Sequence, residues 1–133
     1  MKNINIFQNT NISSVKLSAI NTLEKSLVEN ANKEILLLLS GGSAFSLLSL
    51  NKKYLNSHIT IGVLDERYSA DPQINDFYQL SVTSFFVTAV KARCKFIDTK
   101  VKTNESIQNL AFRFEKELRL WRNYNPKGKI IIT

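Results

Sequence analysis

Several features that would indicate a secreted, membrane or disulfide-rich protein are missing from this sequence. Cysteine occurs once, at Cys94, so no intrachain disulfide can form, and we expect a small buried apolar side chain there. The longest uninterrupted apolar run, residues 35–39, is far shorter than the roughly 20 residues that cross a bilayer. The Asn-rich residues 1–15 have no apolar core and do not resemble a secretory signal. We therefore expect a cytoplasmic protein that is not inserted in a membrane.

What is present fits one folded domain. The chain has 133 residues, of which 44% are hydrophobic and 22% charged, so disorder is not expected. The net charge of +7 is carried entirely by residues 91–133, because residues 1–90 contain equal numbers of acids and bases. Such a basic segment can indicate a nucleic-acid or acidic partner. Here no recognised motif accompanies it, and part of it decorates the solvent face of a predicted helix, so we expect no nucleic-acid binding.

Hydrophobic periodicity indicates alternating strands and helices. Helices are predicted at residues 11–32, 43–50, 74–90 and 107–121, and strands at residues 5–8, 34–40, 58–64, 94–97 and 129–133. The strands at 34–40, 58–64 and 129–133 are apolar on both faces, which is typical of buried strands in a parallel sheet. The pattern predicts a Rossmann-like, three-layer α/β/α domain with a mainly parallel sheet and helices on both faces.

The segment Ser40-Gly41-Gly42-Ser43 joins a predicted strand to a predicted helix. Glycines allow a sharp turn and a close approach of a ligand to the backbone. Amides at the start of the following helix favour an anion, and the Ser43 hydroxyl adds a donor. The segment is therefore a candidate phosphate cradle, although a Gly-Gly pair also serves simply to turn the chain.

The charged triplet Asp65-Glu66-Arg67 directly follows the next predicted strand. Arg67 offers a planar fork suited to phosphate or carboxylate, and Asp65 is a candidate base or hydroxyl-orienting group. The alternative interpretation is a solvated loop with a local ion pair. Because ligands bind at the carboxyl ends of parallel strands, we expect this triplet to lie beside the Gly41-Gly42 turn.

His58 is the only histidine, and it stands at the opposite end of the strand that leads to Asp65. Seven residues of strand separate the two side chains by about 20 Å. We therefore expect no Ser-His-Asp or Cys-His catalytic set. The sequence also shows no clustered metal ligands, so no metal site is predicted.

At these segments the chain resembles the 6-phosphogluconolactonase family, within the wider glucosamine-6-phosphate isomerase/deaminase superfamily. The resemblance rests on Leu-Ser-Gly-Gly-Ser at 39–43, Asp-Glu-Arg at 65–67, Asp71, Asn-Asp-Phe at 75–77 and Gly-Lys-Ile-Ile-Ile-Thr at 128–133. Asp-Glu-Arg favours the lactonase branch, since the deaminase branch typically has Asp-Glu-Tyr.

The sequence also departs from the family pattern. Ala44-Phe45 replace a common Thr-Pro, Ser69-Ala70 replace a Val-Pro, and Asn75-Asp76 replace Ser-Asn. The resemblance covers the whole chain but only the amino-terminal half of the family. The chain stops at Thr133, before the family's Gly-x-Gly-x-Asp-Gly-His motif, so we expect residues 1–133 to be a single truncated domain.

The resemblance implies hydrolysis of 6-phospho-D-glucono-1,5-lactone to 6-phosphogluconate in the pentose phosphate pathway. The family's His, absent here, would be the base, and Asp65 would orient hydroxyls or the water. Gly41, Gly42, Ser43 and Arg67 would grip the phosphate or position the sugar. No metal or organic cofactor is implied, and the ligand would be a phosphorylated sugar lactone or sugar phosphate. Without the His motif, we expect little or no lactonase activity from this chain.

Two other functions remain open from the sequence. The first is isomerisation and deamination of an amino-sugar phosphate, in which Asp65 would be the proton-transfer base. The second is a non-catalytic domain that binds sugar phosphate or docks a partner chain. Ammonia release from glucosamine 6-phosphate by the full-length protein would select the former, and phosphate binding without turnover in the complete protein would select the latter.

Overall fold

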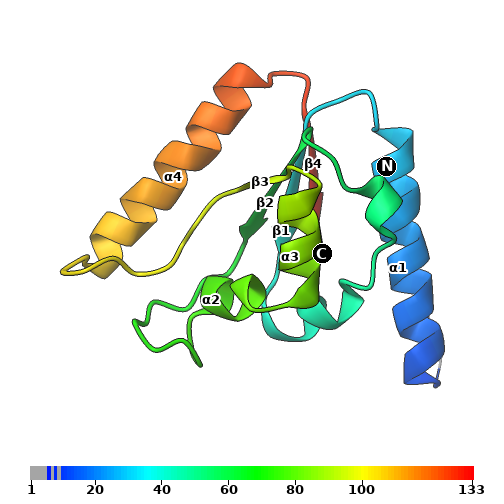
Figure 1. Ribbon diagram of the computed structural model, residues 1–133, viewed down its shortest axis with the longest axis horizontal. Coiled ribbons are helices and arrows are strands. Elements are labelled where there is room, and N and C mark those ends of the chain that lie inside the picture. The colour runs from blue at the N-terminus through cyan, green and yellow to red at the C-terminus, as the bar shows by residue number, and fades with distance from the viewer. Residues whose placement is uncertain (1–5, 7, 9) are drawn as a thin grey trace.

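Helices and strands alternate along the chain in the computed structural model, which describes Ile6, Gln8 and residues 10–133 (Figure 1). In chain order the elements are α1 (Ile12–Glu29), β1 (Ile35–Leu39), the 3-10 helices η1 (Gly42–Leu47) and η2 (Lys52–Tyr54), β2 (Ile59–Val63), α2 (Asp76–Ser81), α3 (Ser84–Lys91), β3 (Lys95–Phe96), α4 (Ile107–Tyr124) and β4 (Lys129–Ile132). The strand predicted at residues 5–8 falls largely outside the described residues.

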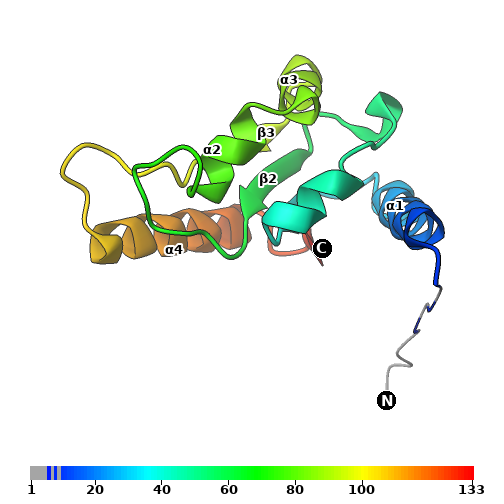
Figure 2. The ribbon, with the colours of Figure 1, turned by 90° about the horizontal axis from the view of Figure 1, so that it is seen from below.

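The four described strands form one sheet in the order β3-β2-β1-β4, and every neighbouring pair is parallel. Figure 2 shows α2 and α3 on one side of this sheet and α4 on the other. The predicted fold class is therefore confirmed: an α/β domain of Rossmann-like architecture with helices on both faces. No helix among the described residues is long and apolar enough to cross a membrane.

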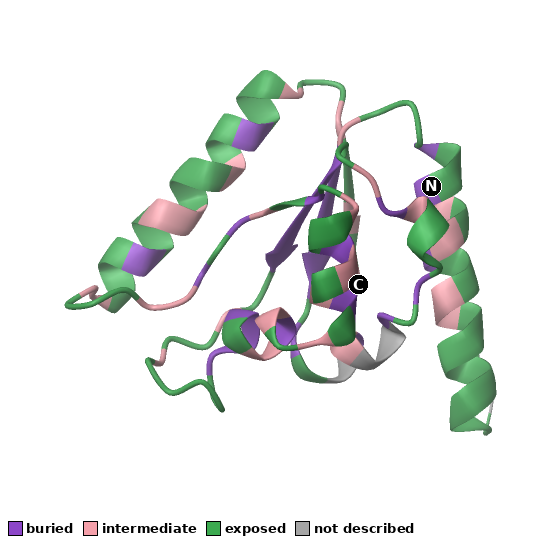
Figure 3. Cartoon of the chain, in the orientation of Figure 1, coloured by how far each residue is buried: buried purple, intermediate pink, exposed green. Residues whose placement is uncertain are grey.

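The core is divided between the two faces of the sheet, and β1, which is coloured as buried in Figure 3, contributes to both. Leu37 and its odd-numbered neighbours belong to a large cluster with α1, α2 and α3, whereas Leu36 and Leu38 pack with Trp121 of α4. All five β1 residues are buried, which explains why this strand is apolar on both faces. Cys94 also lies in the larger cluster, and burial raises the pKa of its thiol, so the expectation of a buried apolar side chain is confirmed.

Two predicted helices differ from the observed ones. The turn after β1 continues as the 3-10 helix η1 instead of an α-helix. The single helix predicted at residues 74–90 is divided into α2 and α3. Thr83 causes this division, because its hydroxyl donates to Leu80 O at 2.7 Å and accepts from Phe86 N at 3.1 Å, which caps a new helix.

The strand at the carboxyl end of the chain was predicted to be buried, and this prediction is wrong for β4. β4 pairs with β1 on one side only, at the edge of the described sheet. Ile130 is 37% exposed and Ile132 is 59% exposed. Ile130 is level with Leu36 on the α4 face, but α4 packs over Leu36 and Leu38 and leaves the isoleucines partly open.

Candidate functional site

The carboxyl ends of β1 and β2 form the edge where both predicted site segments lie. Leu39 is paired with Val63 in the parallel register, and Leu64 N donates to Leu39 O at 2.8 Å. The chain then turns at Gly41-Gly42 on one strand and enters residues 65–67 on the other. The expectation that the two segments lie side by side is confirmed.

The Gly41-Gly42 turn has a backbone that favours glycine at both positions. The φ angles are +57° at Gly41 and +48° at Gly42, in the left-handed region that L side chains rarely adopt. A Cβ on Gly41 would lie only 3.0 Å from Asp76 Cγ, so that glycine also makes room for a carboxylate. Gly41 is buried and Gly42 is exposed. The backbone of Ser43 lies in η1, but its side chain is outside what the structure describes.

Arg67 crosses from the second segment to this turn. Its Nε lies 3.4 Å from Asp76 Oδ2, and its Nη2 lies 3.9 Å from the position of a Cβ on Gly42. The Arg67 side chain is 62% exposed, whereas that of Asp76 is 1% exposed. Buried Asp76 therefore holds the guanidinium at Nε. The side chain is largely exposed, and its Nη2 remains beside the Gly41-Gly42 turn.

Asp76 is the residue of this site that sequence reasoning missed. It is the first residue of α2, and its Oδ1 is buried without a hydrogen-bond partner among the described residues. An unsatisfied buried carboxylate oxygen is costly, so it calls for an explanation. The only signal in the sequence was the resemblance at residues 75–77, which assigned Asp76 no role.

Glu66, the middle residue of the charged triplet, has a structural role that the sequence did not reveal. Its Oε1 accepts from Asp76 N at 2.7 Å, and its Oε2 accepts from Phe77 N at 2.9 Å and from the Thr99 hydroxyl at 2.6 Å. Asn75 caps the same helix, since its Oδ1 accepts from Tyr78 N at 2.7 Å. Glu66 thus fixes the start of α2, and with it the position of Asp76.

Asp65 points to a different side of the edge. It is exposed and lines a cavity of about 260 Å³ between the β2–α2 connection and α4. The rest of the lining is largely apolar and includes Leu110 and Phe114, together with Glu66 and Thr99. Among the described residues Asp65 forms no ion pair, so its carboxylate is free to meet a ligand or a water. The structure places Asp65 on the same edge as Arg67 but not in the Arg67–Asp76 pair.

His58 lies at the opposite, amino-terminal edge of the sheet, as predicted. Its Nδ1 is 2.7 Å from Glu34 Oε1, and Lys95 Nζ is 3.2 Å from Glu34 Oε2. No group of three or more His, Cys, Asp or Glu side chains suited to a metal occurs in the described part of the chain. His58 is thus engaged in a surface ion network and takes no part in the carboxyl edge.

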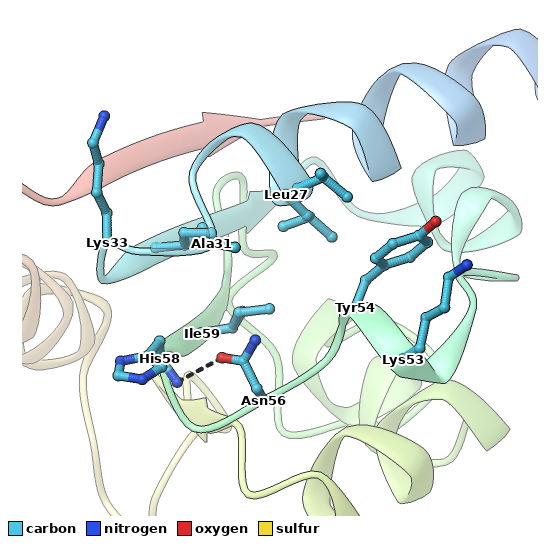
Figure 4. Close-up of a pocket in the computed structure, with 10 residues that line it drawn as sticks. Leu27, Ala31, Lys33, Lys53, Tyr54, Asn56, His58 and Ile59 are labelled. Atoms are coloured by element: carbon cyan, nitrogen blue, oxygen red, sulfur yellow. Dashed lines mark hydrogen bonds between the residues drawn. The ribbon is translucent and has the colours of Figure 1, made fainter.

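A small cavity of about 120 Å³ lies at this amino edge, between α1 and η2 (Figure 4). Its walls are mainly apolar, with Leu27, Ala31 and Ile59 among them. In Figure 4 the ammonium groups of Lys33 and Lys53 point away from these side chains. Asn56 and His58 also line it, but His58 is paired with Glu34 and the Asn56 side chain accepts from His58 N, so the cavity is a weaker candidate site than the carboxyl edge.

The carboxyl edge combines a glycine turn, an exposed guanidinium fork and an exposed carboxylate within two neighbouring loops. Such a set is able to hold an anionic group at Arg67 and to orient a hydroxyl or water at Asp65. Comparisons with protein-family models, with curated protein sequences and with solved structures find no match to this chain.

Proposed function

We propose that the carboxyl edge of the sheet binds a phosphorylated sugar of the kind that 6-phosphogluconolactonases hydrolyse. The observation that carries this proposal is the placement of Arg67 Nη2 beside the exposed Gly42, with Nε already held by Asp76. A guanidinium fixed at Nε presents its terminal nitrogens as a planar fork for oxygen atoms of a phosphate. Gly41 and Gly42 let the ligand come close to the backbone.

In the proposed reaction, water adds to the ester carbonyl carbon of 6-phospho-D-glucono-1,5-lactone. The bond from that carbon to the ring oxygen breaks, the ring oxygen takes up a proton, and 6-phosphogluconate is released. This hydrolysis needs a base for the water, donors for the oxyanion and a grip on the phosphate. Asp65 is an exposed carboxylate on the same edge, and it would orient the sugar hydroxyls or the water. His58 cannot serve as the base because it is held by Glu34 at the far edge. We therefore expect residues 1–133 to bind the ligand with little or no turnover.

The test is a titration with 6-phosphogluconate, which is a stable product and undergoes no hydrolysis, followed by NMR or calorimetry. The Arg67→Met variant keeps the aliphatic stem and removes the fork, so affinity should fall at least roughly tenfold. Arg119→Met is the matched control, because Arg119 is an exposed arginine on α4 whose partner is Glu115. Equal affinities of wild type and Arg67→Met would contradict the proposal, and turnover in a lactonase assay would contradict the expected lack of activity.

A further inference from the structure

The amino edge of the sheet, opposite Arg67, carries a charge equal to the net charge of the protein. The four described strands are parallel, so the segments that lead into them share this edge. These segments, residues 30–34, 52–58, 91–95 and 125–129, contain eight bases and one acid, whereas the rest of the sequence contains ten of each. Counting charge along the sequence does not reveal this arrangement, because three of the eight bases lie in the half of the chain that is neutral as a whole.

Glu34, the one acid of these segments, holds them side by side. Its carbonyl accepts from Lys129 N at 2.8 Å, which joins the first segment to the last. Its carboxylate oxygens lie 2.7 Å from His58 Nδ1 and 3.2 Å from Lys95 Nζ, in the other two segments. The eight bases therefore lie around one continuous face of the molecule.

Most of the positive charge on this face is not balanced by a neighbouring acid. All eight bases are exposed, and only Lys95 is paired, with Glu34. The other seven form no ion pair with an acid in the part of the chain that the structure describes. They are Lys33, Lys52, Lys53, Lys91, Arg93, Lys127 and Lys129. An exposed face with this excess of positive charge attracts a polyanion.

Tyr124 adds an aromatic ring to the same face. It ends α4 directly before residues 125–129, at the top of Figure 1, and it is 81% exposed. Exposed cations that contact phosphates, together with an exposed ring on which a base stacks, are the two features by which proteins bind single-stranded nucleic acid without sequence preference. An acidic peptide uses the cations but offers no nucleobase to stack on the ring.

We propose that the amino edge binds single-stranded nucleic acid, with its lysines on the phosphates and Tyr124 stacked on a base. A domain with a pI near 9.6 and its bases gathered on one face has the electrostatic pattern of nucleic-acid-binding proteins. The inference goes beyond the proposed function, because it concerns the edge opposite Arg67. It replaces the expectation of no nucleic-acid binding, which was based on charge counted along the sequence.

The first experiment measures binding of a fluorescently labelled oligonucleotide of twelve uridines by anisotropy at 50 and 200 mM NaCl. We expect binding at 50 mM and an affinity at least roughly tenfold lower at 200 mM, which corresponds to about two to three phosphate contacts. A peptide of twelve glutamates should displace the labelled oligonucleotide at least roughly fivefold less well than unlabelled oligonucleotide does, because it lacks stacking. Absence of binding at 50 mM, or equal displacement by the peptide, would overturn the proposal.

The second experiment removes two charges from the edge. Lys127→Gln combined with Lys129→Gln should lower the affinity at 50 mM NaCl at least roughly fivefold and weaken its salt dependence, since phosphate contacts are lost. Lys16→Gln combined with Lys116→Gln is the matched control, because it removes the same charge from exposed lysines of α1 and α4 outside the four segments. Equal losses in the two double variants would show that overall charge attracts the oligonucleotide, and would overturn the assignment to this edge.

The third experiment tests the aromatic ring. Tyr124→Ala removes a side chain that is almost fully exposed, so the fold should not change. The affinity for the oligonucleotide should fall at least roughly fivefold, whereas its salt dependence should stay the same, because stacking releases no counterions. Unchanged affinity in Tyr124→Ala would overturn the role of stacking and, with it, the choice of nucleic acid over an acidic peptide.

Discussion

The two ends of the same strands carry charged clusters of opposite character. At the amino edge, Glu34 is paired with His58 and Lys95, and the side chains of both partners are 59% exposed. Burial raises the pKa of Glu34, but hydrogen bonds from His58 and Lys95 outweigh it and leave the pKa below its ordinary value. At the carboxyl edge, Asp76 is almost completely buried, has one long contact to Arg67 and keeps one oxygen without a partner.

This difference makes the carboxyl edge the better candidate for a functional site that holds a small ligand. A charge network that is open to water and fully paired needs no further function, because exposed ion pairs form readily and contribute little. A buried carboxylate with an unsatisfied oxygen is expensive, and it persists only where the surrounding structure fixes it. Glu66 and Asn75 supply that fixation by anchoring the start of α2. The carboxyl edge is thus built at a cost in stability, and the amino edge is not.

The largest expected effect compares one glutamate from each edge. Glu66→Ala removes the acceptor of two backbone amides and the Thr99 hydroxyl, so we expect a loss of about 3 kcal/mol in the free energy of unfolding. Glu34→Ala removes the centre of the exposed network and should cost only about 0.5–1 kcal/mol. Urea denaturation of wild type and both variants measures the two losses in the free energy of unfolding.

The control for Glu66→Ala is Glu115→Ala, at an exposed pair on α4 with Arg119, for which we expect a change under about 0.5 kcal/mol. If Glu34→Ala destabilised the protein as much as Glu66→Ala, the two edges would not differ in the way described above.

An intermediate effect is expected at the glycine turn. Gly41→Ala combines a left-handed backbone with a methyl group 3.0 Å from Asp76 Cγ, so it should cost about 2–3 kcal/mol. Gly42→Ala has a similar φ, but the nearest atom, Arg67 Nη2, is 3.9 Å away, so it should cost only about 1 kcal/mol of backbone strain. Denaturation midpoints of the two variants separate backbone strain from the contact with the buried carboxylate. Equal losses would show that Asp76 does not press against the turn.

Much of the fold follows from local sequence pattern. The apolar run in β1 is buried on both faces, and the periodic residues of α4 include its buried Leu110 and Trp121. The exposure of β4 was not predictable in the same way, because burial depends on what lies beside a strand and not on its own residues. The division at Thr83 depends on a side-chain cap that competes with a continuous helical stripe.

Only one part of the candidate site was predictable from the sequence, namely which two segments lie together at the ends of the strands. The neighbouring positions of Gly41-Gly42 and Arg67 follow from two parallel strands that end at the same edge. The roles of Glu66 and Asp76 arise from contacts across the fold, such as the bond between Glu66 and Thr99, which no local motif encodes. The contacts of polar side chains with residues far away in the sequence could therefore not be predicted.

The smallest expected effect concerns Glu105. Its carboxylate is mostly buried, as is that of Asp76, but both of its oxygens are paired. Glu105 accepts from Arg113 Nε at 2.8 Å and Nη2 at 2.9 Å, and Arg113 also donates to the carbonyls of Asp98 and Lys100. This clamp holds the connection between β3 and α4. The Arg113 guanidinium lowers the pKa of Glu105 from 4.5 to about 2, so the stabilisation is present above pH 4.5 and is lost as the pH falls towards 2.

Arg113→Met should therefore lower the free energy of unfolding by about 1–2 kcal/mol at pH 7. The difference in free energy of unfolding between wild type and variant should narrow between pH 4.5 and pH 2. In that range the unfolded chain takes up a proton at Glu105, whereas the Arg113 pair keeps Glu105 ionised in the folded wild-type protein. Arg119→Met, at an exposed pair, should change stability by less than about 0.5 kcal/mol and show no such narrowing. A gap for Arg113→Met that stays constant down to pH 2 would mean that the clamp acts through the two carbonyls alone. Burial with complete pairing would then contribute no more than the exposed network does, and the contrast between the edges would rest on the unsatisfied oxygen of Asp76 and not on its burial.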